Sequence, residues 1–431
     1  MSRLKQLTIL LGDLVALYLG LYLAIYLRYF TTPNTNQIAG FLQPFTLLFL
    51  LATIIIFISG LYDLRKTKNN RVLFQKILYS AFIWTLLGII FFYIAPNNNI
   101  SPKTILVLTT ITGFGLIAMW RFFYNRFVAL NILKTKIAFV GSSKETQQIR
   151  ELLKNSPQIG YEVVENLENA DLIVLDFNYQ KNEILTQELY RKIFQQTSIV
   201  ELADFYEIIY GRLPPFTFSE SWFLTKFQEQ SKKIYDRFRL LTDYASALIM
   251  AVFFIITYPI IAILIKLNSR GPILFKQARV GRNGKIFFIY KYRTMKALHS
   301  DGSAETKGAQ YATVKDSRIT AVGKFLRATR LDEIPQFINI LKNEMALIGP
   351  RPERPEFVEQ LTTMMPFYTL RHLVKPGLTG WAQLQRSYYG TLDENLSKLE
   401  YDLFYIKNRG PLLDLAIVLK TINVVLGMKG R

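Results

Sequence analysis

Residues 244–265 read YASALIMAVFFIITYPIIAILI and contain no charged side chain. A helix over these 22 residues is about 33 Å long, which is enough to cross the apolar core of a bilayer. Basic residues flank both ends: Lys232, Lys233, Arg237 and Arg239 come before the segment, and Lys266, Arg270, Lys276, Arg279 and Arg282 follow it. Because basic flanks are typical of the cytoplasmic side, both ends are expected on that side.

Pro259 lies inside this apolar segment. Proline removes a backbone hydrogen bond and clashes with the preceding turn, so a break in the helix is expected after Tyr258. Together with the basic flanks, this predicts a re-entrant helix over about residues 244–265, which enters the inner leaflet, bends near Pro259 and returns. The alternative is a straight span, which would place everything after residue 265 outside the cell.

The chain before this segment contains four more long apolar runs, at about residues 7–29, 41–61, 77–95 and 104–123. Each approaches the roughly 20 residues that a helix needs to cross a bilayer, so residues 1–130 predict a four-helix transmembrane bundle. The first run is too long, and too soon followed by others, for a cleaved signal peptide. Segment 62–76 is rich in lysine and arginine, which predicts that both ends of the bundle are cytoplasmic. Asp13 lies within the first run and is expected to face a neighbouring helix.

Charge is distributed unevenly over the 431 residues, whose formal net charge is +20. The net charge is +9 over residues 1–130, −4 over residues 131–231 and +15 over residues 232–431. A basic excess indicates nucleic acid, an anionic membrane face or a phosphate-bearing substrate. The chain has no cysteine and two histidines, His299 and His372. This composition excludes disulfide scaffolds, thiolate zinc sites, a cysteine nucleophile and a His-rich metal cluster, so any metal must be held by carboxylates.

Residues 131–231 have the pattern of a small soluble α/β domain followed by a linker. Buried strands are predicted at 136–140 and 170–176, with helices from Gly141 to Lys154 and over 188–195. A strand that ends in glycine before a helix resembles the start of a dinucleotide-binding unit. The turn 141–144 reads GSSK, however, and lacks the second and third glycines that let a pyrophosphate approach the backbone. We therefore expect a degenerate Rossmann-like domain with a structural or regulatory role rather than nucleotide binding.

Residues 272–295 predict a β-hairpin that turns at Asn283-Gly284. Because alternate residues of a strand share one face, Lys291 and Arg293 are expected to project on the same side. The following stretch, 331–336, reads LDEIPQ. In one interpretation Asp332 caps a helix whose apolar face comprises Ile334, Phe337, Ile338 and Leu341.

The alternative interpretation of the Asp332–Glu333 pair is chemical. Adjacent carboxylates can hold Mg²⁺ together with substrate phosphates, or one of them can attack phosphorus. A helix N-terminus favours anions, and nearby basic residues would neutralise a diphosphate. Residues 349–352 read GPRP, in which two prolines fix the backbone around Arg351 and its guanidinium matches a phosphate.

The region from about Lys232 to Gly430 resembles the bacterial sugar transferase family, the monotopic polyprenyl-phosphate hexose-1-phosphate transferases. The resemblance is carried by Gly271-Pro272, Phe275-x-Gln277-x-Arg279-Val280-Gly281, Lys291-Tyr292-Arg293-Thr294-Met295, Asp316-x-Arg318-Ile319-Thr320, Arg327-x-x-Arg330-Leu331-Asp332-Glu333-Ile334-Pro335-Gln336, Gly349-Pro350-Arg351-Pro352 and residues 375–383, KPGLTGWAQ, with Tyr401-Asp402 and Asp414 beyond. Together with the N-terminal blocks, it resembles the long, several-domain members. It implies a membrane protein of α and α/β class, with the transmembrane bundle, the Rossmann-like domain and a compact α/β catalytic domain that includes the re-entrant helix.

The resemblance implies an undecaprenyl-phosphate sugar-1-phosphate transferase that acts in exopolysaccharide, capsule or O-antigen assembly. Such an enzyme moves hexose-1-phosphate from a UDP-sugar to undecaprenyl phosphate at the cytoplasmic face of the bacterial inner membrane, releases UMP and requires Mg²⁺. It implies that Asp332 is the nucleophile of a covalent phosphosugar intermediate and that Glu333 assists as a metal or acid/base partner. Phosphate-binding positions are implied at Arg327 and Arg351, and we expect the basic side chains of Lys291, Arg293 and Arg318 to bind phosphate as well.

One segment departs from the short family members, which have Asn-Gly-Arg after the tryptophan motif. Here residues 384–390 read LQRSYYG, so no role is assigned to Arg386, and Tyr388-Tyr389 are left between sugar binding and packing. The sugar, the polysaccharide pathway, the role of the Rossmann-like domain and the oligomeric state, a homodimer included, are left open. Anionic inner-leaflet lipids are expected partners of the +15 block.

Three other classes of protein agree less well with the sequence. A polytopic transporter needs polar residues within its spans, and only Asp13 qualifies. A basic nucleic-acid module would show binding that is lost at high salt and no UMP release, and the concentration of charge in two blocks argues against it. A nucleotide sensor centred on residues 131–231 lacks the necessary glycines.

Overall fold

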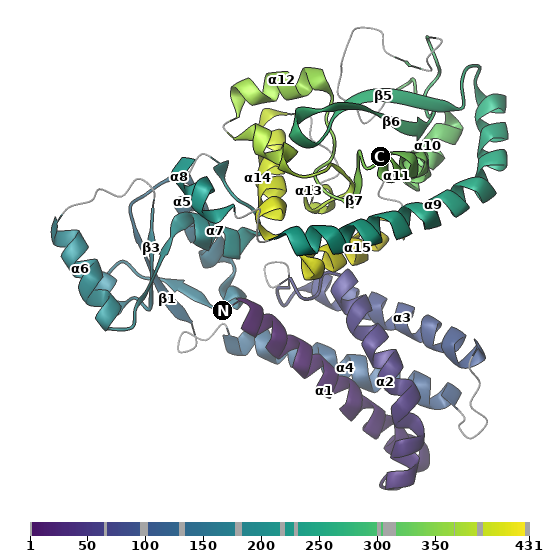
Figure 1. Cartoon of the computed structure of the whole chain (residues 1–431). Helices are drawn as coiled ribbons and strands as arrows, with labels where there is room; N and C mark the ends of the chain where they lie inside the picture. The colour runs from purple at the N-terminus through teal and green to yellow at the C-terminus, as the bar shows by residue number, and fades with distance from the viewer. Residues whose placement is uncertain are drawn as a thin grey trace. The chain divides into compact units, whose positions relative to one another are not determined.

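The computed structural model describes residues 2–63, 67–94, 102–128, 134–176, 183–215, 220–227, 232–299, 303–304, 316–365, 367–385 and 391–426. Arg386 and Tyr388-Tyr389 lie outside these residues, as do Arg65 and Lys66 of the basic segment 62–76. The chain forms two compact units, Met1–Ile208 and Ile209–Arg431, and Figure 1 labels most of their α-helices and strands.

The first unit begins with four long helices: α1 (Ser2–Tyr29), α2 (Thr35–Ile58), α3 (Arg71–Ile94) and α4 (Pro102–Val128). These helices and α9 of the second unit are the five in the described residues that are long and apolar enough to cross a membrane. Side chains from all four share one hydrophobic core, which includes Leu17, Phe45, Trp84 and Ile117. The helices overlap the four predicted runs and extend beyond most of their ends. Their passage across a bilayer stays a prediction.

Asp13 is completely buried and faces α4, as predicted. Arg121 of α4 donates to both of its carboxylate oxygens, at 3.2 and 2.5 Å, and a further nitrogen of the same guanidinium donates to the carbonyl of Leu61 at 2.6 Å. A buried carboxylate in an apolar helix is costly unless it is paired and hydrogen-bonded. The ion pair therefore explains how a charged residue is accommodated here.

The rest of the first unit is the predicted parallel α/β region, with strands β1 (Thr135–Val140), β2 (Tyr161–Val163), β3 (Leu172–Leu175) and β4 (Ser198–Glu201) and helices α5 (Lys144–Asn155), α6 (Glu183–Phe194) and α7 (Leu202–Tyr210), the last of which ends just inside the second unit. The strand order is β2-β1-β3-β4 and every pair is parallel. Gly141 takes a φ of 97° directly after β1, and the side chain of Ser143 caps α5. Helix α6 begins five residues before the predicted helix 188–195.

The second unit contains α8 (Glu220–Lys226), α9 (Lys233–Asn268), β5 (Leu274–Val280), β6 (Ile286–Tyr292), α10 (Ala321–Ala328), the 3₁₀ helix η7 (Leu331–Gln336), α11 (Phe337–Leu341), β7 (Ala346–Ile348), α12 (Pro355–Met364), η8 (Tyr368–Leu373), β8 (Gly377–Thr379), α13 (Trp381–Gln385), α14 (Leu392–Asn408) and α15 (Pro411–Leu426). Strands β5 and β6 form the predicted antiparallel hairpin. Asn283 and Gly284 turn it with φ values of 56° and 75°, which asparagine and glycine tolerate best. Strands β7 and β8 form a separate parallel pair.

Helix α9 corrects one prediction, because it continues through Pro259 and does not break after Tyr258. The helix has 36 residues and bends along its length (Figure 1). A proline costs a helix only the bonds next to it, and the turn before it is packed: the Tyr258 ring lies 5.0 Å from Phe254 and 6.4 Å from Tyr292 of β6. A bend without a break is the result. The re-entrant course through the membrane stays a prediction.

The segment after Arg330 corrects two more predictions. Asp332 is not a helix N-cap, because it lies inside η7, and Arg330 occupies the cap position with a φ of 61°. The predicted apolar face of 334–341 is also wrong, since Leu341 is 45% exposed whereas Asn339 is completely buried. The two turns of 3₁₀ helix before α11 change the angular register, and Asn339 then reaches the hairpin, where its amide bonds the backbone of Phe288 and Tyr290.

Candidate active site

The two carboxylates of the predicted site lie side by side in η7, which packs against β6, α9 and α10. Arg330, in the left-handed conformation, turns the chain from α10 into η7. Asp332 is 8% exposed and Glu333 is 6% exposed. Acidic residues are seldom this deeply buried unless they are paired or functional, so their partners decide what the pair can do.

Glu333 is held by three cations. Its Oε1 accepts from Lys291 Nζ of β6 at 2.9 Å and from Arg351 Nη2 at 2.9 Å, and its Oε2 lies 3.4 Å from Arg330 Nη1. Burial alone would raise the pKa of Glu333, but the charges of Arg351, Lys291 and Arg330 outweigh it and hold that pKa well below its ordinary value. Glu333 is therefore a fixed anion that organises the basic side chains around it.

The Asp332 side chain has no hydrogen bond or ion pair among the described residues. Burial and the adjacent Glu333 charge raise the pKa of Asp332 to about 6, against the opposing effect of Lys291, Arg327 and Arg330. Neighbouring carboxyl groups whose environments push their pKa values apart commonly have different chemical roles. Here the carboxylate of Glu333 is held by three cations, whereas the buried carboxylate of Asp332 has no hydrogen-bonding or ionic partner among the described residues. Asp332 can therefore act as a nucleophile or a base near neutral pH.

The structure places the other predicted phosphate-binding residues in two groups. Arg351 and Lys291 contact Glu333, and the Arg327 side chain, which donates to Thr294 Oγ1 at 2.8 Å, interacts electrostatically with Asp332. The guanidinium groups of Arg293 and Arg318 are engaged elsewhere.

Arg293 donates to the backbone carbonyls of Ser269 and Arg270 at the end of α9, and Arg318 binds Asp316 at 2.6 Å and the carbonyl of Ala304 at 2.8 Å. The end groups of Lys291 and Arg293, which were expected on one face of the hairpin, have different partners: Lys291 binds Glu333, and Arg293 binds the carbonyls of Ser269 and Arg270.

Comparison with known proteins finds relatives of the second unit. The model of the bacterial sugar transferase family matches residues 234–428. The exopolysaccharide production protein PSS of Rhizobium leguminosarum bv. phaseoli is 34% identical over 43% of this chain and 91% of its own length. This chain belongs to the bacterial sugar transferase family.

Two other members of the sugar transferase family are more similar over a shorter stretch. The UDP-N-acetylgalactosamine-undecaprenyl-phosphate N-acetylgalactosaminephosphotransferase of Aeromonas hydrophila is 48% identical over 38% of this chain and 38% of its own length. The UDP-glucose:undecaprenyl-phosphate glucose-1-phosphate transferase of Escherichia coli K12 is 43% identical over 38% of this chain and 34% of its own length. The chain thus matches little more than a third of the length of these two relatives.

Two arginines near the site have no assigned role in the sequence-based prediction. Arg330 contacts Glu333, and Arg279 of β5 donates to the carbonyl of Pro352 at 3.1 Å. Burial and the charges of Arg351 and Arg354 lower the pKa of Arg279 to about 9. Both residues lie within motifs that carry the family resemblance, but no local pattern indicates which basic residues converge on one carboxylate.

Of the two residues predicted to bind magnesium, only Asp332 has a carboxylate that is available to the ion. The residues that the structure describes contain no group of three or more His, Asp or Glu side chains able to hold a metal. Lys291, Arg330 and Arg351 occupy the oxygens of Glu333, so Glu333 is not available as a ligand in this arrangement. The Asp332 carboxylate is open. Because Mg²⁺ binds proteins through one or two carboxylates and takes its other ligands from phosphates and water, a diphosphate-bound Mg²⁺ fits against Asp332.

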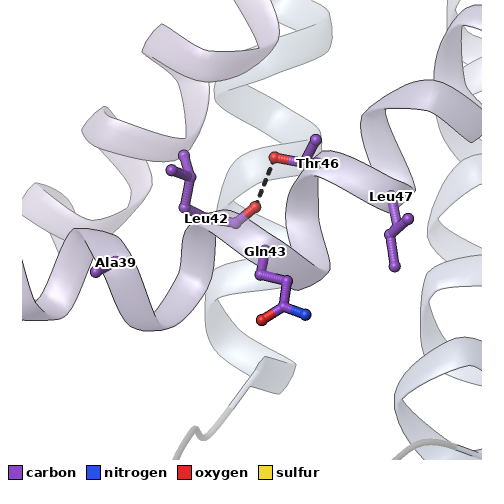
Figure 2. Close-up of a pocket in the computed structure, with 5 residues that line it drawn as sticks. All are labelled: Ala39, Leu42, Gln43, Thr46 and Leu47. Carbon is purple, nitrogen blue, oxygen red and sulfur yellow. Dashed lines mark hydrogen bonds between the residues drawn. The ribbon is translucent and has the colours of Figure 1, made fainter.

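A pocket of about 400 Å³ is formed by helix α2 of the first unit. Figure 2 shows its lining residues, Ala39, Leu42, Gln43, Thr46 and Leu47, and the hydrogen bond from the Thr46 hydroxyl to the Leu42 carbonyl. The pocket is open, mostly apolar and formed by a single helix, and it contains no titratable side chain. It has none of the chemistry that a sugar transferase needs.

Proposed function

We propose that the chain transfers a sugar-1-phosphate from a UDP-sugar to undecaprenyl phosphate and releases UMP. The observation that carries the proposal is the unequal Asp332–Glu333 pair, in which Glu333 is fixed by three cations and Asp332 is open with a pKa of about 6. The names of the relatives above support the substrates, and the five apolar helices support a membrane setting. We place the reaction at the cytoplasmic face of the bacterial inner membrane, where undecaprenyl phosphate would present its phosphate.

In the proposed first step, ionised Asp332 attacks the phosphorus that carries the sugar. A bond forms between a carboxylate oxygen and that phosphorus, the bridging P–O bond breaks, and UMP leaves with the bridging oxygen. In the second step an oxygen of undecaprenyl phosphate attacks the same phosphorus, which releases Asp332 and gives the diphosphate-linked lipid sugar. The acyl phosphate lets a soluble donor and a lipid acceptor use one site in turn.

The basic side chains around the pair supply the electrostatic part of the proposal. Arg351 and Lys291 are held against Glu333, and Arg327 interacts with Asp332, so positive charge is already in place where the diphosphate charge would lie. Preorganised donors of this kind stabilise developing charge without reorganisation during the reaction. Magnesium bound with the substrate would neutralise further phosphate charge next to Asp332. The +15 C-terminal block also supports contact with anionic lipids of the inner leaflet.

The test uses the purified full chain in lipid nanodiscs with undecaprenyl phosphate, Mg²⁺ and, separately, UDP-glucose, UDP-galactose, UDP-N-acetylglucosamine and UDP-N-acetylgalactosamine. Release of UMP with at least one donor is expected, and that donor identifies the sugar. Without the lipid, about one UMP per active site should appear, and the peptide containing Asp332 should gain the mass of the sugar phosphate.

The Asp332→Asn variant should show neither the UMP nor the mass gain, while Glu356→Gln serves as a matched control because Glu356 is exposed and pairs with Arg354. Full turnover by Asp332→Asn, or no UMP from any of the four donors with the unsubstituted protein, contradicts the proposal.

A further inference from the structure

The segment 350–353, which contains Arg351, is fixed by hydrogen bonds to its backbone carbonyls. Four consecutive carbonyls, those of Pro350, Arg351, Pro352 and Glu353, accept hydrogen bonds from Gly377 N at 2.9 Å, Arg371 Nη2 at 2.8 Å, Arg279 Nη1 at 3.1 Å and Val280 N at 2.9 Å, respectively. These donors come from η8 and β8, which follow the segment in the sequence, and from β5, which precedes it by about 70 residues. Two of the four bonds are made by arginine side chains, which is the feature that calls for an explanation.

Arg371 makes the bond to the carbonyl of Arg351 itself. Arg371 is 3% exposed, and its guanidinium also donates to Tyr368 Oη at 2.7 Å and to Asp402 Oδ2 of α14 at 2.8 Å. Asp402 is 2% exposed. A buried ion pair is poor evidence for stability, because well-packed apolar side chains of similar volume usually serve a core as well or better. The Arg371 guanidinium also donates to the carbonyl of Arg351, which gives the Arg371–Asp402 pair a role other than stabilising the core.

Arg351 needs such support because its side chain is weakly packed. The side chain is 34% exposed, and its guanidinium meets Glu333 at 2.9 Å and lies 3.5 Å from Gln383 Oε1. A long side chain reaching from a mobile backbone would lose its position at the phosphate, and a misplacement of about 1 Å can cost on the order of 100-fold in rate. Fixing the backbone at Arg351 itself reduces that misplacement.

We propose that Arg371 and Asp402 are positioning residues that act through Arg351. Asp402 and Tyr368 orient the Arg371 guanidinium, Arg371 holds the carbonyl of Arg351, and the Arg351 side chain is thereby kept at Glu333, where it meets the donor diphosphate. Arg279 of β5 donates to the next carbonyl, that of Pro352, and so also helps to fix the backbone of this segment. The inference rests on the proposed function, since it assigns these residues a part in binding and transfer at that same site.

The experiment measures UMP release by the full chain in nanodiscs with Arg371→Lys, which keeps the charge and loses the fork. We expect kcat/KM for the UDP-sugar to fall by about 10- to 100-fold, with a raised KM for that donor. A variant that only lowered the amount of folded protein would reduce the maximal rate and leave the KM unchanged. In an Arg351→Ala background the same Arg371→Lys change should cost less than about threefold, because the side chain it positions is gone.

Two further variants keep the test decisive. Arg371→Met combined with Asp402→Leu removes the pair and preserves apolar packing, so it should fold with a melting temperature near that of the unsubstituted protein and still lose about 10- to 100-fold in kcat/KM. Arg409→Lys is the matched control: Arg409 is equally buried, pairs with Asp236 at 3.0 Å and bonds the Ile406 carbonyl, away from residues 349–353. It should leave the KM for the UDP-sugar unchanged.

Three results overturn the inference: a kcat/KM within threefold of the unsubstituted protein in both folded Arg371 variants, an equal loss from Arg371→Lys with and without Arg351, or a raised KM in Arg409→Lys. If the unsubstituted protein releases no UMP from any donor, the proposed function fails instead, so the two failures are distinguishable.

Discussion

Replacing Asp332 by asparagine should stabilise the protein while it abolishes transfer. Asp332 is 8% exposed and has no hydrogen-bonding partner among the described residues, and its pKa of about 6 lies above the ordinary 3.8 because burial and the Glu333 charge disfavour the ionised form. The folded protein therefore binds this proton more tightly than the unfolded chain does. Its stability falls as the pH rises from about 4 to about 6, and at higher pH the full cost of ionisation is present.

The difference between the two pKa values corresponds to a cost of about 3 kcal/mol at neutral pH, and asparagine, which has nearly the same volume and no charge, removes it. For a folded unit of about 200 residues, this is a rise in melting temperature of about 6–12 °C. At pH 4.5 the carboxyl is largely protonated in the folded state, and only about 1 kcal/mol of the gain should remain.

The assay is thermal unfolding of the detergent-solubilised full chain at pH 7.5 and pH 4.5, for the unsubstituted protein and for Asp332→Asn. Glu356→Gln is a control of opposite sign, because hydrogen bonds from Arg354 lower the pKa of Glu356, and its loss should slightly destabilise the protein at pH 7.5. A melting temperature for Asp332→Asn below that of the unsubstituted protein at pH 7.5, or a gain of equal size at both pH values, refutes the assignment of Asp332 as a buried, strained carboxylate.

Three other outcomes are expected. Glu333→Gln removes the like charge beside Asp332 and should move the acid limb of the kcat profile at least about 1 pH unit lower, whereas an unmoved limb excludes coupling between the two carboxylates. Gly377→Ala should reduce UMP release by at least about tenfold, because a Cβ there would lie 2.0 Å from Gly349 N, whereas Gly115→Ala, where a Cβ meets nothing within 4 Å, should stay within twofold. Chelation with EDTA should stop UMP release, and added Mg²⁺ should restore it. The melting temperature of the substrate-free protein should change by less than about 1 °C, since no carboxylate cluster among the described residues holds the ion. A large change would indicate a resident metal.

Features that depend on neighbouring residues in the chain could be predicted from the sequence. The apolar helices follow from runs long enough to span about 30 Å, and the β5–β6 hairpin follows from Asn283-Gly284, since few residues other than these accept positive φ. The pairing of Asp13 with another helix could also be predicted, because an unpaired carboxylate among apolar helices is too costly. In the α/β region, strands β1 and β3 and the helix after Gly141 follow from periodicity, whereas β2 and β4 were not predicted.

Local patterns failed wherever packing decided the outcome. Helix α9 continues through Pro259 where Tyr258 packs against Tyr292 of β6, a tertiary contact that helix propensity does not include. The Arg293 guanidinium binds the Ser269 and Arg270 carbonyls whereas Lys291 binds Glu333, and no pattern in the strand indicates these different partners.

The residues of the candidate site could thus be named from the sequence, and their partners were decided by the tertiary structure. Asp332 and Glu333 are chemically similar neighbours, and a sequence cannot tell which of them is open. The difference arises because Lys291, 42 residues earlier, and Arg351, 18 residues later, reach Glu333 and not Asp332. The same holds for Arg371 and Asp402, 31 residues apart, whose bond to the Arg351 backbone exists only once η8 and α14 pack together. Burial and charge–charge interactions depend on distance in space, and the fold alone sets that distance.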